Sequence, residues 1–339
     1  MEEAAKHLAK EFLCSGINLF LSGKYEHAEK RLKETLELDP TAALAYCYLG
    51  IIALETGRLS EALNWCTKGL ESEPGDSYLR YCYGVALDRG NYSKEAIEQY
   101  RAYVVLHPDD IECWFSLGGV YHRLKRFHEA IECFDKILEL DPWNPQSLYN
   151  KAVVLGDMED EAGALRLLES IVSKNPLYWK AWVKLGYLFS HNKQWDRATE
   201  AYERVVQLRP DLSDGHYNLG LCYLTLDKTR LALKAFQEAL FLNEEDADAY
   251  FYVGLAHMDL KQPKQAHEAF SRSLGINLEH ERAHYLLGYL YHTQGEAEKA
   301  AKELLFLTTK ESMFAPLLQK TLASNPSAVQ FGRRLDAIS

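Results

Sequence analysis

The stretch ECWFSLGGVYHRLKRFHEAIECFDKILELDP, residues 112–142, contains the signals that decide the fold. Its small residues Gly118 and Ala130 and its closing Pro142 each recur along the chain every 34 residues. The prolines are Pro40, Pro74, Pro108, Pro142, Pro176 and Pro210. The glycines are Gly16, Gly50, Gly84, Gly118, Gly186, Gly220, Gly254 and Gly288, with Ala152 in the one gap. The alanines are Ala28, Ala62, Ala96, Ala130, Ala164, Ala198, Ala232, Ala266 and Ala300. A fixed interval of this kind indicates a repeat protein.

The interval defines nine units, which begin near residues 9, 43, 77, 111, 145, 179, 213, 247 and 281. Counted from the start of a unit, apolar residues fall at positions 4, 7, 8 and 11 and again at 20, 24 and 27, so each unit is expected to form two helices. The small residue at position 8 is expected to face the alanine at position 20, where a larger side chain would separate the backbones. Proline at position 32 ends the second helix. Because one thin helix pair cannot bury its own apolar face, the pairs must stack into a solenoid.

These units resemble the tetratricopeptide repeat, and the resemblance covers residues 9–314. Repeat four carries the pattern as Trp114, Leu117, Gly118, Tyr121, Ala130, Phe134 and Pro142, and repeat six as Trp182, Leu185, Gly186, Phe189, Ala198, Tyr202 and Pro210. The resemblance implies an all-α fold: a right-handed superhelical solenoid of helix-turn-helix repeats over residues 1–314. Residues 315–339 are expected to form a C-terminal capping helix and tail, since Leu317, Leu318 and Leu322 suit a helix that covers the last repeat.

Two departures from the pattern lead to further expectations. Position 32 holds Glu244, Leu278 and Ser312 in the last three repeats, so their second helices are expected to run on or to end less sharply. The N-terminus shows no cap beyond an extended first helix. This leaves open that the chain was cut from a larger protein or that repeat one contacts a partner.

Repeat four also holds Cys113, His122, His128 and Cys133, which are residue types that bind zinc or form activated nucleophiles. Cys113 and His122 lie nine residues apart on one helix, which at about 100° per residue puts them on opposite sides. His128 and Cys133 diverge by about 140° on the next helix. No nucleophile, phosphate-loop or zinc-protease motif occurs elsewhere. We therefore expect no metal, cofactor or catalytic residue, and the resemblance also implies a chain that is not an enzyme by itself.

Composition narrows the partners and the compartment. The formal net charge of −11 argues against nucleic acid as a partner, and RNA-binding helical repeats would need a basic groove. The first residues lack the pattern of a signal peptide, and no apolar run is long enough for a membrane span. Seven cysteines without a CxxC pair suit a reducing compartment. The sequence predicts a soluble, cytoplasmic protein that binds neither nucleic acid nor membrane.

The remaining arc of each first helix, at positions 2, 5, 6, 9, 12 and 13, is expected to line the concave surface on which the resemblance implies that a partner's peptide segment binds. The candidate protein-binding residues are Tyr81, Arg89, Phe115, His122, Arg123, Tyr149, Asn150, Lys180, Lys184, Tyr187 and Asn218. A basic cluster among aromatics predicts an acidic or backbone-rich segment. Asn150, Lys180 and Lys184 match only half of the family's clamp for a C-terminal carboxylate, because Phe115 and Gly119 replace the other half.

Repeats one and two place an almost wholly apolar set on the same surface: Leu13, Ile17, Phe20, Leu21, Leu44, Tyr48, Ile51 and Leu54. Such a set is either a partner site or a contact with a second copy of the chain. The sequence thus predicts a non-catalytic scaffold or adaptor that binds a peptide segment. The alternative is a substrate-recruiting region of an enzyme whose catalytic domain or subunit lies outside this chain.

Overall fold

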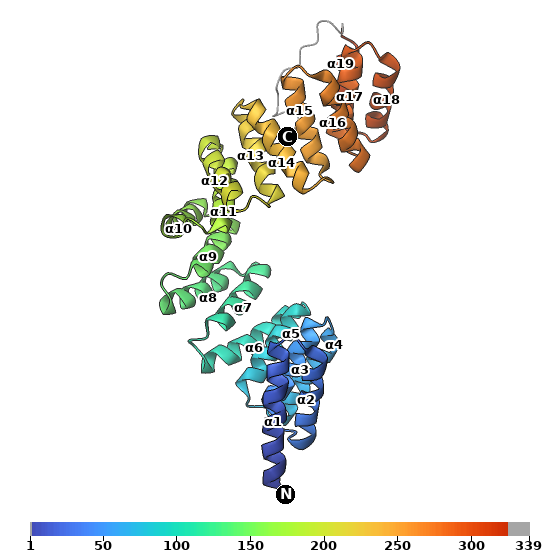
Figure 1. Cartoon of the computed structure of the whole chain (residues 1–339). Coiled ribbons are helices and arrows are strands. Elements are labelled where there is room, and N and C mark those ends of the chain that lie inside the picture. Colours follow the sequence, from blue (N-terminus) through green and yellow to red (C-terminus); the bar gives the residue numbers. More distant parts are fainter. Residues whose placement is uncertain (1, 325–339) are drawn as a thin grey trace. The chain divides into compact units, whose positions relative to one another are not determined.

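The computed structural model describes residues 2–324, and all regular structure in that range is α-helical (Figure 1). The first helices of the nine repeats are α1 (Glu2–Leu21), α3 (Ala43–Glu55), α5 (Ser77–Arg89), α7 (Ile111–Arg123), α9 (Pro145–Asp157), α11 (Trp179–His191), α13 (Ser213–Thr225), α15 (Ala247–Asp259) and α17 (Glu281–Thr293). The second helices are α2 (Tyr25–Leu38), α4 (Leu59–Ser72), α6 (Ser93–Leu106), α8 (Phe127–Leu140), α10 (Glu161–Lys174), α12 (Trp195–Leu208), α14 (Thr229–Leu242), α16 (Pro263–Ile276) and α18 (Ala297–Thr309). A short helix, α19 (Ala315–Leu322), follows.

From the second repeat to the ninth, each first helix begins at the residue where the 34-residue interval begins. Side chains just before five of these helices explain the starting point, and one of them is His280, whose Nδ1 accepts from the N–H of Ala283 at 3.2 Å. Asp76, Asp110, Asn144 and Asp246 each accept a hydrogen bond from the backbone N–H three residues later, as Asp110 does from Cys113 at 3.0 Å. Such caps satisfy donors that have no partner inside the helix.

The turn inside each repeat has one left-handed residue, always at position 15. It is glycine in three repeats, Gly23, Gly57 and Gly295, with φ between 73° and 78°. The other six repeats place Asn91, Lys125, Glu159, Lys193, Asp227 and Lys261 there, with φ between 56° and 65°. Because left-handed backbone costs about 1–2 kcal/mol for a residue with a side chain, the packing of the two helices must hold these turns in place.

The second helices of repeats seven and eight do not run on, although they lack the proline at position 32. α14 and α16 each contain 14 residues, as does the proline-terminated α12. The residue at position 31 explains the stop. The Asn243 side-chain oxygen accepts from the N–H of Glu245 at 3.2 Å, and that of Asn277 accepts from Glu279 at 3.0 Å. These turns redirect the backbone out of the helix without proline.

In seven repeats the nearest neighbour of the position-8 glycine differs from the predicted one. A Cβ added at Gly118 would lie 2.9 Å from the ring of Phe134, and one at Gly254 would lie 2.4 Å from Phe270. These partners stand at position 24, not at the alanine of position 20. The glycine leaves space into which a large side chain of the facing helix packs, and the alanine at position 20 is buried.

Consecutive repeats are joined by a bond that recurs at position 4. There a side chain donates to the backbone carbonyl at position 32 of the preceding repeat, as Trp114 Nε1 does to Pro108 at 2.9 Å. The same bond is made by Tyr46, Arg80, Trp182, His216 and His284 to Pro40, Pro74, Pro176, Pro210 and Leu278. In these six repeats position 4 therefore fixes the first helix to the turn before it, whereas Leu148 of repeat five has no side-chain donor there.

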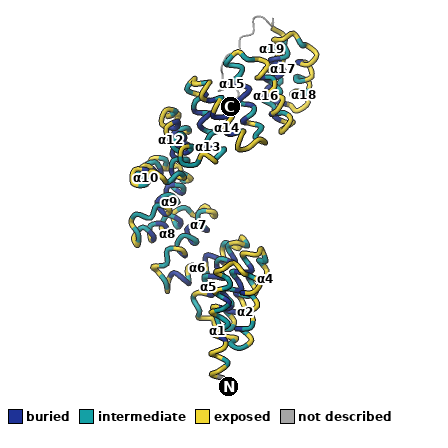
Figure 2. Tube along the Cα trace, in the orientation of Figure 1, coloured by how far each residue is buried: buried dark blue, intermediate teal, exposed yellow. Residues whose placement is uncertain are grey.

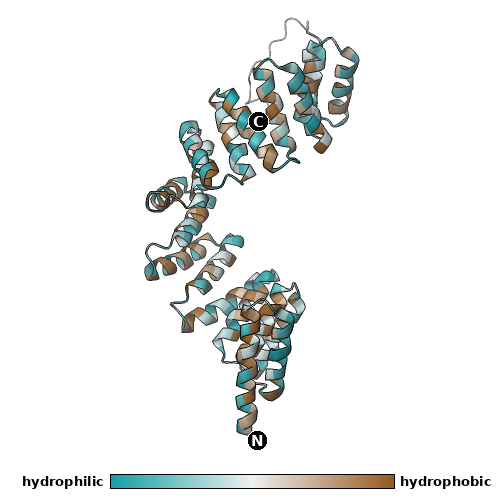
Figure 3. Cartoon of the chain, in the orientation of Figure 1, coloured by the Kyte–Doolittle hydropathy of each residue, from teal (hydrophilic) through white to brown (hydrophobic). Residues whose placement is uncertain are grey.

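Packing divides the chain into two compact parts of several repeats each, with the boundary inside α10. We call Met1–Leu167 the first unit and Leu168–Ser339 the second unit. Buried residues lie where helices face each other, and polar residues cover the outer faces (Figures 2 and 3). At the end of the second unit α19 packs on α17 and α18, where Phe314 and Leu318 are buried with Leu307. The rest of the predicted capping segment, residues 325–339, lies outside the described residues. None of the described helices has the length and apolar character that crossing a bilayer requires.

Candidate functional site

The first unit contains a groove of about 660 Å³ along α7, which we call the α7 groove. Its size falls within the range of about 300–1,000 Å³ that is usual for binding sites. The lining residues are Asp88, Ile111, Glu112, Phe115, Ser116, Gly119, Arg123, Asn144, Gln146 and Asn150. Most of them stand at positions 2, 5, 6, 9, 12 or 13 of repeats three to five, the columns that the sequence assigns to the concave surface.

Three features of the α7 groove suit a segment of extended peptide. Phe115 lies half-buried, with its ring centroid 6.2 Å from that of Phe134 in the core. Gly119 opens the wall, because a Cβ added there would meet no atom within 4 Å. The half-buried Asn150 amide has no hydrogen-bond partner among the described residues. A side-chain amide can donate to and accept from the backbone of an extended peptide.

The predicted basic cluster is neutralised within the first unit. Arg89 pairs with Glu55 at 3.1 Å, and Arg123 pairs with Asp88 from the neighbouring repeat. His122 Nε2 lies 2.6 Å from a carboxylate oxygen of Asp157. Positions 12 and 13 of adjacent repeats come together because the repeats stack in register. These exposed pairs contribute little to the free energy of folding. They do engage Arg89 and Arg123, which the sequence had offered as cations that would bind an acidic ligand.

The two tyrosines predicted in this unit are half-buried. Tyr81 lies with its ring centroid 5.2 Å from that of Tyr103, and burial raises its pKa although hydrogen bonding with Ser116 acts in the opposite direction. Burial also raises the pKa of Tyr149. Both phenols therefore stay protonated and neutral at physiological pH.

The other predicted residues belong to the second unit. Lys180 lies over the Trp179 ring at 5.9 Å, and Lys184 lies over the Tyr187 ring at 5.2 Å. The Asn218 amide is occupied, since its nitrogen donates to the carbonyl of Asp214 at 2.8 Å. The lysines are thus held by their own helix, α11, and Asn218 differs from Asn150 in having a partner.

Several groove residues were absent from the predicted set: Asp88, Ile111, Glu112, Ser116, Gly119, Asn144 and Gln146. The signal for most of them was present in the sequence, because they occupy the same columns as the predicted residues. A selection for basic, aromatic and asparagine side chains passed over the acids, the glycine and the small polar residues. The two acids, Asp88 and Glu112, contribute negative charge to the α7 groove.

The apolar set of repeats one and two is largely covered within the chain. Phe20 packs against Tyr25 and Tyr48, with ring centroids 5.8 and 5.3 Å apart. Of the eight residues only Leu21 and Leu44 are exposed, at 72% and 44%. The surface left for a partner or a second copy is smaller than the sequence suggested.

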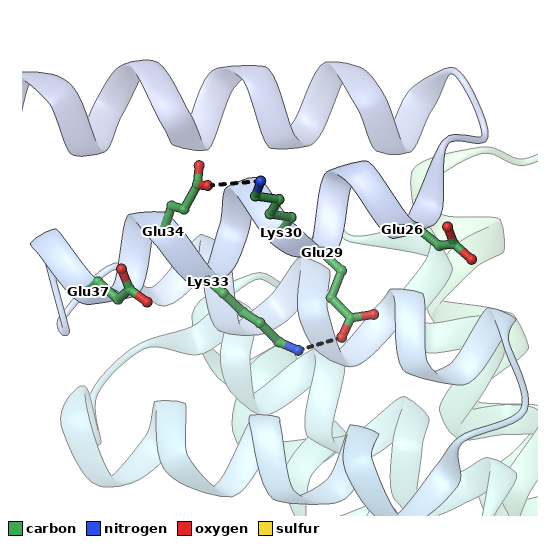
Figure 4. A pocket seen from close by; sticks show the side chains of 6 residues that line it. All are labelled: Glu26, Glu29, Lys30, Lys33, Glu34 and Glu37. Atoms are coloured by element: carbon green, nitrogen blue, oxygen red, sulfur yellow. Dashed lines mark hydrogen bonds and ion pairs between the residues drawn. The ribbon is translucent and has the colours of Figure 1, made fainter.

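A second concavity, of about 600 Å³, lies over α2 and is lined by Glu26, Glu29, Lys30, Lys33, Glu34 and Glu37 (Figure 4). All six belong to one helix. Lys33 pairs with Glu29 at 2.6 Å, and Lys30 lies 4.0 Å from Glu34. Charges that pair along one exposed helix form a solvated surface, so the α7 groove is the better candidate.

The cysteines and histidines of repeat four lie in different surroundings. Cys113 and Cys133 are buried in the core, which raises the pKa of each thiol to about 12. His122 is engaged by Asp157, and His128 is exposed. Over residues 2–324 no three His, Cys, Asp or Glu side chains are arranged to hold a metal ion.

Comparison with known proteins agrees with this architecture. Family models described as tetratricopeptide repeat match residues 19–81, 111–144, 149–213, 213–246 and 254–305. Among solved structures, the APC/C hetero-tetramer Cut9–Hcn1 aligns with 82% of this chain and 55% of its own at 17% identity, with a TM-score of 0.50. Pseudomonas aeruginosa pilF aligns with 66% of this chain and 99% of its own at 19% identity, with a TM-score of 0.54. These structures share the fold.

Two curated relatives show how much of a longer protein such an array can represent. Human protein O-mannosyl-transferase TMTC1 is 27% identical over 193 residues, which are 56% of this chain and 22% of the relative. The Drosophila melanogaster BBSome complex member BBS4 homolog is 23% identical over 245 residues, which are 68% of this chain and 50% of the relative. The chain therefore matches about a fifth of the first protein and half of the second.

Proposed function

Because the chain belongs to the tetratricopeptide repeat family, we propose that it is a non-catalytic scaffold that binds an extended segment of a partner protein in the α7 groove. The observation that carries the proposal is the combination of an open wall at Gly119 with an unengaged amide at Asn150. The open wall admits a side chain of the segment, and the amide binds its backbone. Affinity then comes from several modest contacts on a preformed surface.

The test is capture of partner proteins from the native cell with the wild-type chain and with Gly119→Leu. The substitution places a large side chain in the groove at a position where an added Cβ meets no atom within 4 Å, so we expect the fold to be kept and the segment to be excluded. We expect mass spectrometry to show that the partners retained by the wild type fall by about tenfold or more. Circular dichroism checks that helicity is unchanged.

Gly275→Leu provides the matched control. Gly275 also lies in a helix with no atom within 4 Å of an added Cβ, but it is on α16 in the second unit. We expect this variant to capture the same proteins as the wild type. Equal capture by the wild type and Gly119→Leu would show that partners bind elsewhere.

A second candidate function follows from the likeness to protein O-mannosyl-transferase TMTC1, of which the chain matches about a fifth. In this case the array recruits the substrate of an enzyme whose catalytic part lies outside the chain. This function would be supported if an enzyme were among the captured proteins and if its activity on a second captured protein were lower with the Gly119→Leu variant than with the wild type. Capture of non-enzymatic proteins alone would favour the scaffold.

We place the scaffold in the cytoplasm, with proteins rather than nucleic acid or membranes as partners. The support is chemical. All seven cysteines are free thiols, and six of them are buried, as suits a reducing compartment. The acidic charge balance disfavours a phosphate backbone as the ligand.

A further inference from the structure

The α7 groove is lined by two carboxylates and one guanidinium, and the guanidinium is already engaged. Arg123 donates to the Asp88 carboxylate, which reaches it from the preceding repeat. The pair lies on the wall of the groove and leaves no cation free among the described residues that line it. The local net charge is negative, in contrast to the basic surface that the sequence suggested.

Glu112 supplies the remaining charge. It is exposed in the first turn of α7, and its carboxylate has no ion-pair or hydrogen-bond partner among the described residues. The nearby Ser116 hydroxyl donates to the backbone carbonyl of Glu112 and not to its carboxylate. A carboxylate suits the positive end of a helix dipole, and that of Glu112 lies on the lining of the groove.

The neighbours of Glu112 on α7 provide a path for a long cationic side chain. Residues 112, 115 or 116, and 119 follow one another at three- and four-residue spacing, so they form one stripe on the helix. Phe115 offers an aromatic surface for an apolar stem or a cation, and Gly119 leaves space one turn further along. An acidic side chain in the same place would face Glu112 and Asp88.

We propose that the segment bound in the α7 groove carries a lysine or arginine, whose stem lies along Phe115 and whose cationic group pairs with Glu112. The proposal rests on the function proposed above, since it states which class of peptide the groove selects. It replaces the acidic segment expected from the sequence. Glu112 acts as the residue that determines specificity, while Asn150 binds the backbone of any segment.

Synthetic peptides test the charge preference directly. Three sets of short acetylated and amidated peptides carry Lys, Gln or Glu at the centre and only Ala, Ser, Val, Leu and Asn elsewhere. For a partly exposed ion pair we expect the wild-type chain to retain the Lys set about three- to tenfold better than the Glu set. Glu112→Gln should remove the preference and Glu112→Lys should invert it, and the preference should weaken as salt is raised.

Glu132→Lys makes the same charge change on α8, at an exposed residue outside the groove, and should keep the preference for the Lys set. A wild-type preference for the Glu set, no preference, or a preference that persists in Glu112→Lys would overturn the inference. The groove itself is tested separately with Gly119→Leu. If that variant retains every set as well as the wild type, the proposed binding site is wrong. If it loses them while charge makes no difference, only the basic class is wrong.

Discussion

Gly118 and Gly119 are adjacent in the sequence but point about 100° apart around α7, into different surroundings. A Cβ at Gly118 would lie 2.9 Å from Phe134, whereas a Cβ at Gly119 would meet nothing within 4 Å. Neither residue has the left-handed backbone that would itself require glycine. The first glycine is needed for packing, and the second leaves space in the groove.

These surroundings predict opposite effects of the same substitution. Gly118→Ala should lower the free energy of unfolding by about 1–3 kcal/mol, because the new Cβ would clash with the ring of Phe134 and the ring would have to move. Gly119→Ala should raise it by about 0.5–1 kcal/mol, because alanine favours the helix and meets no obstacle. Urea unfolding of the two variants and the wild type measures both changes. A loss of similar size in both variants would contradict this account.

At the scale of elements, the bond from position 4 connects six of the first helices to the turn of the repeat before them. In repeat nine the side chain that makes this bond is titratable. His284 Nε2 donates to the Leu278 carbonyl at 3.0 Å, and Nδ1 lies 2.5 Å from a carboxylate oxygen of Glu303 on α18. A ring with an acceptor at each nitrogen is best satisfied as the doubly protonated imidazolium.

Burial lowers the pKa of His284, but the hydrogen bonds to Glu303 and Leu278 and the nearby negative charges outweigh it, so the pKa rises above its ordinary value of 6.5. A group whose pKa is raised by folding stabilises the folded state fully below its unfolded pKa and loses that contribution as pH rises through the folded value. We therefore expect α17 and α18 to lose protection from hydrogen exchange, corrected for intrinsic rates, as pH rises above about 6.5.

His284→Tyr is the control for the titration. Tyrosine makes the position-4 bond in repeat two and does not titrate in this range. The other ionisable groups around repeat nine, including His280, whose pKa burial lowers, are unchanged in this variant. The difference between the two chains therefore isolates His284. An equal pH dependence in both would assign the effect to another group.

At the scale of the whole molecule, the contacts follow the chain from one helix to the next, so a local change should stay local. Leu318 on α19 is fully buried, and a Cβ at Gly288 would lie 2.6 Å from it. Leu318→Ala should cost about 2–5 kcal/mol at this end of the array. Hydrogen exchange should rise in α17 to α19 while α7 and the retention of peptides stay as in the wild type. A matching rise in α7 would mean that the array unfolds as one cooperative body.

The fold could be predicted from the sequence because its main signals are local and repeated. The 34-residue interval places the start of α7 at Ile111, and the small residue at position 8 marks a close approach of helices. Which side chain of the facing helix contacts Gly118 depends on the length of that side chain. Positions 20 and 24 are both buried, and the atoms nearest to an added Cβ at Gly118 belong to the ring of Phe134 and not to Ala130. A pattern of apolar residues gives the direction of a side chain but not its length.

The candidate site was only partly predictable. The columns correctly place Phe115, Arg123 and Asn150 along one groove. The engagement of Arg123 by Asp88, 35 residues earlier in the chain, was not predicted. Such contacts depend on the offset between stacked repeats and on side-chain rotamers. Neither the offset nor the rotamers can be predicted from the 34-residue interval.

The pair between Asp88 and Arg123 also bears on how such an array could acquire new partners. Because Arg123 is balanced by an acid from the preceding repeat, replacing that acid changes two side chains at once. Asp88→Asn, which one nucleotide change can encode, would remove a negative charge and release the Arg123 guanidinium into the groove. A protein of this design can therefore pass from preferring one charge in its ligands to tolerating the other in a single mutational step, while its fold stays unchanged.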